Sequence, residues 1–251
     1  MDLIYPHHRP NLTREDLLEV YAWPEEGSYL RANMAASIDG SARDDDGRSE
    51  GISSPADKDV FKLLRHTADA VVVGAGTVTA ENYGPMPMRE EWQSWRAAND
   101  RSPLVPVVVV VTNHASISPE ARVFSGPPGS SLVATAGSAD PERLQALRQV
   151  TEVIVVGDDK VDVPTLRSAL TERGLLRLLT EGGPHFLASA LPILDELCLT
   201  TSPLILGAPV EGARPAPDLL GGMEVASRKA TLKSVIAADD SLLVVWNTAD
   251  R

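Results

Sequence analysis

Apolar runs and amphipathic segments alternate along most of the chain. Apolar runs after residue 60 predict buried strands at 70–73, 107–111, 132–135, 153–156 and 175–179, and several of these runs are unbroken. Unbroken runs, unlike alternating ones, are typical of parallel strands that are covered on both faces. Amphipathic stretches with capping residues or prolines at their starts predict helices at 13–20, 55–65, 141–150, 164–173 and 184–191.

The order of these elements predicts the fold class. Alternating strands and helices give an α/β fold with a mostly parallel central sheet and helices on both faces. A further strand is predicted at 29–38, and two more at 196–201 and 242–246. Because no helix separates the last two, we expect antiparallel edge strands near the C-terminus. No repeat or linker divides the chain, which predicts a single domain over residues 1–251.

Two segments, 84–106 and 207–222, are long, irregular and rich in proline. Loops of this length in a compact domain are usually functional or disordered. Trp92 and Trp95 favour an ordered flap with a short helix in the first segment.

Composition narrows the class of protein. A net charge of −12 over 251 residues argues against a protein that holds nucleic acid through its phosphates. The single cysteine, Cys198, excludes a disulfide framework and a zinc site with two or more cysteines, and its apolar surroundings predict a buried, inert thiol. The histidines lack ligand spacing, so no metal site is predicted. We expect a cytoplasmic protein without a membrane partner, because no signal peptide or bilayer-spanning run is visible.

The most informative motif is Glu181-Gly182-Gly183-Pro184-His185, which follows the apolar run at 175–179. Two glycines at a strand-to-helix turn let the backbone approach a ligand closely. The free N–H groups at a helix start suit a phosphate, and Pro184 fits a first helical position. Glu181 comes at the carboxyl end of a strand, where α/β sheets contact their ligands. The alternative interpretation is a tight turn with a solvated glutamate, and His185 is either a phosphate ligand or a surface imidazole.

Four other clusters each leave two interpretations open. Asp39 follows small residues at a strand end and is either an available carboxylate or part of a plain Asp-Gly turn. The polar loop 47–53 either wraps a ligand or connects elements. Arg65, the predicted last residue of its helix, either complements the helix dipole or offers a fork to a phosphate. The Gly-x-Gly at 74–76 is weak evidence of nucleotide binding, because the full fingerprint is absent.

Together these clusters form an ordered set that spans residues 31–207. The segments are Ala36-Ser37-Ile38-Asp39-Gly40, Gly47-x-Ser49-x-Gly51-Ile52-Ser53, Leu64-Arg65-x-x-Ala68-Asp69-Ala70, Val73-Gly74-Ala75-Gly76-Thr77-Val78, Glu181-Gly182-Gly183-Pro184, Asp195-Glu196-Leu197 and Ser202-Pro203-x-x-x-Gly207. The set resembles the reductase domain of bacterial riboflavin biosynthesis, which has a dihydrofolate-reductase-like fold. In this resemblance residues 1–27 are an N-terminal extension and residues 28–251 are the core. No zinc-deaminase motif is present, so we expect a stand-alone reductase of a divergent type seen in actinobacteria, and a homodimer.

The resemblance implies an NADPH-dependent reduction of a phosphoribosylamino-pyrimidine, a small-molecule substrate whose ribose is opened to a ribityl chain. It implies Asp39 and Glu181 as catalytic residues, and Arg65 on the 5′-phosphate of the substrate. The implied substrate-binding residues are Asn33, Ser49, Arg65, Pro85, Arg89 and Glu181. The implied cofactor-binding residues are Ala35, Gly51, Gly74, Gly76, Thr77, Glu81, Thr112, Asn113, Gly182, Gly183, Pro184, His185, Phe186 and Leu187, with Asn113 near the adenosine phosphate.

Four positions depart from the family pattern. Asn33 replaces a lysine, Gly51 a tryptophan, Glu81 an aspartate and Met88 an arginine, for which the adjacent Arg89 can substitute. The lost positive charge weakens the case for the phosphorylated pathway substrate and leaves the NADPH site largely intact. A pterin such as dihydrofolate, or another small imine or carbonyl, stays an alternative substrate, because Gly51 enlarges the pocket. A third alternative is a protein that binds NADPH without turnover and meets partners through its acidic loop at 43–46 and its flap.

Overall fold

A computed structural model of the chain describes residues 1–44, 49–207 and 218–249. Half of the acidic loop (45–46), the start of the polar loop at 47–48 and most of the segment 207–222 lie outside the described residues. The chain forms two compact units. Unit 1 comprises residues 1–24, 31–64 and 194–251, and unit 2 comprises residues 25–30 and 65–193. The single domain expected over residues 1–251 stays a prediction.

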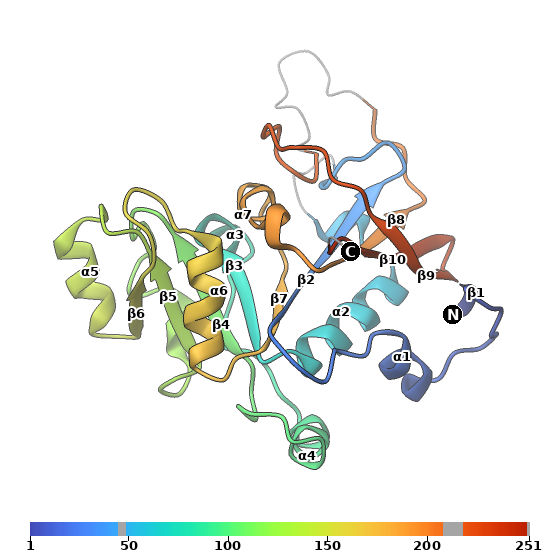
Figure 1. Ribbon diagram of the computed structural model, residues 1–251, viewed down its shortest axis with the longest axis horizontal. Coiled ribbons are helices and arrows are strands. Elements are labelled where there is room, and N and C mark those ends of the chain that lie inside the picture. Colours follow the sequence, from blue (N-terminus) through green and yellow to red (C-terminus); the bar gives the residue numbers. More distant parts are fainter. Residues whose placement is uncertain (45–48, 208–217, 250–251) are drawn as a thin grey trace. The chain divides into compact units, whose positions relative to one another are not determined.

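Unit 2 is built on five parallel strands in the order β7-β3-β4-β5-β6 (Figure 1). They are β3 (Ala70–Gly74), β4 (Val107–Thr112), β5 (Ser131–Thr135), β6 (Glu152–Val155) and β7 (Arg177–Thr180). Nearly every residue of β3 and β5 is buried, so both faces of these strands are covered. This confirms the inference that the unbroken aliphatic runs are parallel strands. Because the strands are parallel, the segments after β3, β4, β5 and β7 all start at one edge of the sheet.

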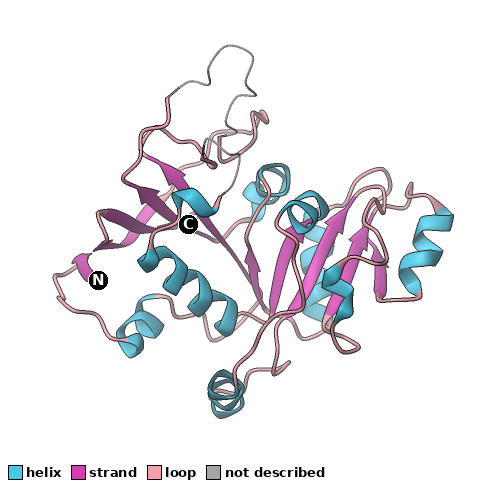
Figure 2. Cartoon of the chain, turned by 180° about the vertical axis from the view of Figure 1, so that it is seen from behind, coloured by secondary structure: helices cyan, strands magenta, loops and turns pink. Residues whose placement is uncertain are grey.

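Helices follow these strands in unit 2 (Figure 2). They are α3 (Ala75–Ala80), α4 (Glu90–Ala98), α5 (Pro141–Arg148), α6 (Val163–Glu172) and α7 (Pro184–Ala190), with short 3-10 turns η2 (Arg122–Ser125) and η3 (Leu191–Ile193). Carboxylates cap two of them: Asp140 accepts from the backbone N–H groups of Glu142 and Arg143, and Asp162 accepts from Thr165. The predicted helices α5, α6 and α7 are confirmed to within two residues at each end.

Unit 1 carries the antiparallel strands that the sequence predicted. Its strand order is β1-β9-β10-β8-β2, in which β2 and β8 are parallel and the other pairs are antiparallel. The strands are β1 (Asp2–Tyr5), β2 (Tyr29–Ser37, in this unit from Arg31), β8 (Glu196–Ser202), β9 (Thr231–Ala238) and β10 (Ser241–Asn247). The sequence did not predict β1 and β9. Both have few buried positions: β9 buries only Ser234 and Ile236, and β1 buries only Leu3.

The helices of unit 1 start at well-formed caps. Helix α1 (Arg14–Val20) has a capping box between Thr13 and Asp16. Helix α2 (Pro55–Thr67) follows the short turn η1 (Glu50–Ile52), and Asp239 accepts from its first free N–H group at 2.9 Å. Since α2 runs to Thr67, the prediction that it ends at Arg65 is wrong by two residues.

Three further observations concern the cysteine, groups of metal-ligand side chains and the length of the helices. Cys198 is buried, as expected, and burial raises the pKa of its thiol. Within residues 1–44, 49–207 and 218–249 no group of three or more His, Cys, Asp or Glu side chains is placed to hold a metal ion. The helices of the same residues are all too short or too polar to cross a membrane.

Candidate functional site

The side chain of Glu181 is the centre of a buried polar network in unit 2. It follows β7 directly and is 3% exposed, so the interpretation as a solvated glutamate is wrong. The Arg65 guanidinium donates from Nε to Oε1 and from Nη2 to Oε2, both at 2.5 Å. The hydroxyl of Tyr83 donates to Oε2 at 2.5 Å and accepts from Arg65 Nη2 at 3.0 Å. Three donors therefore hold the carboxylate in one orientation.

The network keeps Arg65 charged and Tyr83 neutral. Burial lowers the pKa of Arg65, but the charge of Glu181 and the hydrogen bonds to it outweigh burial and raise the pKa overall. Burial, and then the Glu181 charge, raise the pKa of Tyr83. The phenol therefore stays a hydrogen-bond donor. The fork of Arg65, predicted to bind a substrate phosphate, is engaged by Glu181 in this structure.

The glycine turn after Glu181 packs against the start of α3. Gly182 has φ +91°, a conformation that favours glycine, and its carbonyl accepts from the N–H of Gly74 at 3.2 Å. The Gly182–Gly183 peptide is cis. A Cβ on Gly183 would lie 2.7 Å from Thr77 Oγ1, whereas a Cβ on Gly76 would meet nothing within 4 Å. The two glycine turns, Gly74–Gly76 and Gly182–Gly183, thus pack together and leave open space beside Gly76 at the start of α3. We call this pair of turns the cradle.

Several predicted cofactor ligands have structural roles in the same unit. Thr112 is buried and its Oγ1 accepts from the N–H of Ser116 at 3.1 Å. Asn113 Oδ1 accepts from the N–H of Val161 at 2.9 Å, which ties the end of β4 to the loop before α6. Phe186 and Leu187 are both buried, and Phe186 Cβ lies 4.0 Å from the position that a Cβ on Gly74 would take. Their contacts with a cofactor stay predictions.

Two more residues beside the glycine turns are exposed. Glu81 is the C-cap of α3, and His185 lies in the first turn of α7, which agrees with a surface imidazole. Pro184 opens α7 as predicted. Contacts of these residues with a cofactor also stay predictions.

The segment 84–106 is an ordered flap with a short helix, α4, as predicted. Arg96 in this helix is fully buried and donates to the carbonyls of His66, Ala68 and Pro103. Pro85 is half-buried and Arg89 is exposed just before α4. The substrate contacts implied for Pro85 and Arg89 stay predictions.

Asp39 belongs to unit 1 and ends a tight turn after β2. Its carboxylate accepts from Ser37 Oγ at 2.6 Å and from the N–H groups of Leu206 and Gly207 at 3.2 and 2.7 Å. The Ser37 hydroxyl and these N–H groups lower the pKa of Asp39 to about 2. Gly40 completes the turn with φ +89°. Asp39 is thus ionised at neutral pH and holds the loop after β8, which favours the turn interpretation.

The other predicted residues of unit 1 lie on β2 and around η1. Asn33 is buried and paired in register with Cys198, and Ala35 is half-buried beside Thr200. Ser49 and Gly51 are exposed. A Cβ on Gly51 would overlap the side chain of Asp44, so a larger residue there requires Asp44 to move.

Sequence reasoning missed Tyr83 and assigned no role to Asp69 and Glu196, two residues of the quoted motif segments. Tyr83 contacts Glu181 across 98 residues of sequence, and no local pattern marks it. Asp69 accepts from the N–H groups of Leu176 and Arg177 at the start of β7, and thereby aligns β7 with β3. Glu196 forms a fully buried ion pair with Arg31. A buried acid at a strand start is the signal that could have marked the last two as structural.

Comparison with known proteins agrees with the resemblance seen in the sequence. The model of the family described as RibD C-terminal domain matches residues 28–243. A 2,5-diamino-6-ribosylamino-4(3H)-pyrimidinone 5′-phosphate reductase from Methanothermobacter thermautotrophicus is 32% identical over 221 residues, which are 87% of this chain and 97% of that protein. The enzyme of the same name from Archaeoglobus fulgidus is 30% identical over 181 residues, 71% of this chain and 82% of its own.

A solved structure extends this similarity to the fold. The pyrimidine reductase-like protein from Corynebacterium diphtheriae superposes with a TM-score of 0.81 at 29% identity, and the match covers 94% of this chain and 99% of that one. The alternation of strands and helices that the sequence predicted is therefore shared with a protein of similar length and sequence.

Proposed function

Because the chain belongs to the RibD C-terminal domain family, we propose that it reduces a ribosylamino-pyrimidinone 5′-phosphate with NADPH. The relatives that carry the name of this reaction support the proposal. The observation that carries it in the structure is the Glu181 network, which lies directly before the glycine turn that packs on Thr77.

The cradle of glycine turns fits the cofactor. A nicotinamide cofactor needs close backbone approach and room for its phosphates, and the turns at Gly74–Gly76 and Gly182–Gly183 offer both. Thr77 and the first residues of α7 would hold it in unit 2. When bound, NADPH supplies the hydride that reduces the ribose carbon.

Glu181 is proposed to contact the substrate, with Arg65 and Tyr83 as positioning residues. The carboxylate is fixed by three hydrogen bonds before any ligand arrives, which lowers the entropy lost when the reacting groups are aligned. Asp39 is a poor proton donor because its pKa is about 2. Its role in this proposal is to hold the loop at 204–207.

The test is a substrate panel that follows NADPH absorbance. It contains 2,5-diamino-6-ribosylamino-4(3H)-pyrimidinone 5′-phosphate, its deaminated uracil counterpart and dihydrofolate. We expect turnover with one of the two pyrimidines. Turnover with dihydrofolate alone would show that the substrate is a pterin and not a pyrimidine. Tight NADPH binding with no turnover would show that the protein binds the cofactor without catalysis.

The fit of the cofactor is tested by a matched pair of glycine variants. Gly183→Ala adds a Cβ 2.7 Å from Thr77 Oγ1, at a φ of −58° that alanine adopts freely. We expect its NADPH dissociation constant to rise at least about tenfold. Gly137→Ala is the control, since its Cβ would lie at 3.5 Å from its nearest neighbours. Unchanged affinity in Gly183→Ala would contradict the cradle.

A cytoplasmic homodimer is part of the proposal, as the sequence resemblance implies. Analytical ultracentrifugation of the purified chain and fractionation of cells that express it test these two points.

A further inference from the structure

Three arginines lie around one carboxylate at the amino ends of the strands of unit 2. Asp69 directly precedes β3, and Arg177 is the first residue of β7. Arg96 belongs to α4, and Arg101 follows that helix and donates its backbone N–H to the Arg96 carbonyl at 2.8 Å. We call these four residues the arginine cluster. Since Glu181 comes four residues after Arg177, a rise of about 13 Å along a strand, the cluster lies at the edge of the sheet opposite the glycine turns.

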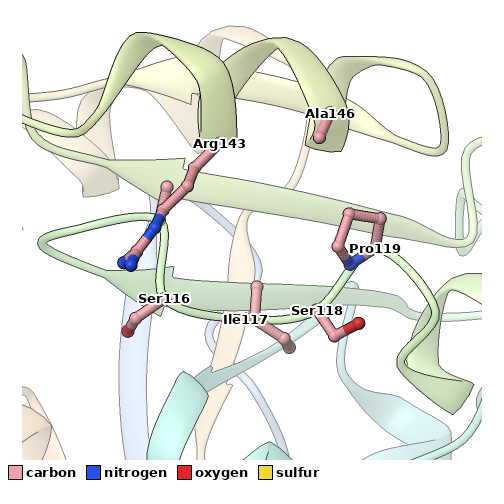
Figure 3. Close-up of a pocket in the computed structure, with 7 residues that line it drawn as sticks. Ser116, Ile117, Ser118, Pro119, Arg143 and Ala146 are labelled. Atoms are coloured by element: carbon pink, nitrogen blue, oxygen red, sulfur yellow. The ribbon is translucent and has the colours of Figure 1, made fainter.

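The cavity in Figure 3 lies at the other edge of the sheet. Its volume is about 420 Å³, and it is lined by residues 115–119 and by Arg143 and Ala146 of α5. Because residues 115–119 follow the carboxyl end of β4, this cavity shares its edge with the cradle. A ligand of the arginine cluster would therefore be separate from anything that the cradle holds.

Two members of the arginine cluster, Asp69 and Arg96, are engaged by the protein itself. Asp69 is fully buried and accepts from two backbone N–H groups and from Arg177 Nη1 at 3.2 Å. Arg96 Nη2 lies 3.7 Å from Asp69 Oδ1, and the guanidinium also donates to three backbone carbonyls. Within the part of the chain that the structure describes, Asp69 is the one carboxylate in an ion pair with these arginines. Three guanidinium groups thus share a single paired carboxylate.

The other two members, Arg101 and Arg177, keep donors without acceptors. The Nε atoms of both are buried and have no hydrogen-bond partner among the described residues. Arg177 bonds through Nη1 alone, and the guanidinium of Arg101 makes no hydrogen bond or ion pair with any residue that the structure describes. A buried donor that stays unpaired costs its full desolvation penalty. The two Nε–H groups therefore indicate an acceptor from outside the chain.

The charge of the arginine cluster indicates the same kind of ligand. Burial, and then the charge of Arg177, lower the pKa of Arg101, although the charges of Asp69 and Asp100 act in the opposite direction. The two guanidinium groups thus repel each other, in a chain whose net charge is −12. The side chain of Arg177 is 15% exposed and Arg101 is half-buried, so an ion from solvent can reach both. An anion between them would relieve the repulsion.

We propose that Arg101 and Arg177 bind a phosphate group, as inorganic phosphate or as part of a small phosphomonoester. The edge that Nε and Nη form on a planar guanidinium matches two phosphate oxygens, so two such edges suit a tetrahedral anion. The bound phosphate ties the segment after α4 to β7. The site does not rest on the proposed function, because none of its residues belongs to the Glu181 network or to the cradle.

Calorimetry at constant ionic strength tests the site, with chloride as the background anion. The probes are inorganic phosphate and glycerol 3-phosphate, and the tighter of the two identifies the source of the phosphate group. We expect Arg101→Met to raise the dissociation constant of that probe at least about tenfold. Arg177→Lys, which keeps a charge beside Asp69 but lacks the guanidinium edge, should raise it less. Arg148→Met, at the exposed end of α5, is the matched control and should bind as wild type.

Thermal unfolding separates loss of binding from loss of folding. In chloride alone, Arg101→Met should melt at least as high as wild type, because it removes a buried cation that Arg177 repels. Phosphate should raise the melting temperature of wild type and of Arg148→Met but not of Arg101→Met. An equal rise in Arg101→Met, or a rise in wild type that chloride of the same ionic strength reproduces, would overturn the site. Either result leaves the proposed function intact, since NADPH affinity is expected to be the same in Arg101→Met and wild type.

Discussion

Each unit buries an arginine against a glutamate, but the two pairs differ in what surrounds them. In unit 1, Arg31 Nε lies 2.5 Å from Glu196 Oε1, and both side chains are 0% exposed. Arg31 also donates to the carbonyls of Tyr21 and Ala22, and its guanidinium stacks on Trp23 at 4.0 Å. Backbone and aromatic groups thus surround Arg31, which lies in β2 and pairs in register with Glu196 at the start of β8.

In unit 2, the pair of Arg65 and Glu181 lies at the opposite kind of strand end. Glu181 follows the carboxyl end of β7, Arg65 is 20% exposed, and the third member is the hydroxyl of Tyr83. The next residues are the glycine turn with open space beside it. The same type of ion pair is therefore fully buried at the amino end of a strand and partly exposed at the carboxyl end of another. The carboxyl ends of strands are where α/β sheets bind their ligands. In the proposed function, position in the sheet and not the pairing itself distinguishes the structural pair from the pair at the candidate site.

The largest effect, on the free energy of unfolding, is expected when the buried pair of Arg31 and Glu196 is broken. Glu196→Ala leaves the Arg31 charge buried without its carboxylate, which should cost about 3–5 kcal/mol of unfolding free energy. Urea unfolding measures the loss, and NADPH affinity of the folded fraction should not change.

Two further variants keep this prediction testable if Glu196→Ala fails to fold. Lys233→Ala removes the half-exposed partner of Glu196 and should cost about 1 kcal/mol or less. The double variant Arg31→Met with Glu196→Leu should recover most of the stability, because apolar side chains can replace a buried pair. A single Glu196→Ala as stable as wild type would remove the contrast between the two pairs.

The second effect is on turnover rather than stability. Glu181→Gln keeps the shape of the side chain and removes its charge, so kcat should fall at least about 100-fold through loss of substrate positioning. NADPH affinity should stay within about twofold, since the glycine turn is unchanged. Glu152→Gln is the control, because it alters an exposed pair with Arg173. A Glu181→Gln variant that is unstable yet fully active would make this pair structural too.

The sequence predicted those parts of the molecule that short-range patterns determine. The aliphatic runs of β3, β4 and β5, the cap at Thr13 and the glycine turn after Glu181 are all local. The partners of Glu181 are not local, since Arg65 is 116 residues away and Tyr83 is 98 residues away. Strand β9 was missed for a related reason: its pairing with β1 and β10 defines it, and its apolar run, 235–238, is confined to its second half.

A smaller effect is expected at Tyr83, which separates a positioning role from a purely structural one. Tyr83→Phe removes one hydrogen bond to Glu181, worth about 1 kcal/mol, so kcat should fall about fivefold with KM for NADPH unchanged. Because the pKa of Tyr83 is raised, its hydroxyl is protonated throughout the working range, and the pH profile should keep its shape in the variant. Tyr5→Phe, at an exposed tyrosine, is the control. Equal turnover in both variants would exclude a role for the Tyr83 hydroxyl.

The smallest effect is expected at Asp39, which tests the remaining catalytic prediction against its observed hydrogen bonds. Its pKa is lowered to about 2, so its stabilising contacts are complete above its unfolded pKa of about 3.9 and are lost only as pH falls through about 2. The pH profile of kcat should show no ionisation of this group above about pH 4. Asp39→Asn keeps one acceptor oxygen for Ser37 Oγ and the N–H of Leu206 and loses the acceptor for the N–H of Gly207, so the loop is partly held and turnover should change by less than about threefold. A loss as large as that of Glu181→Gln would place Asp39 at the reacting centre, and an accessible carboxylate outside unit 2 would then share the chemistry.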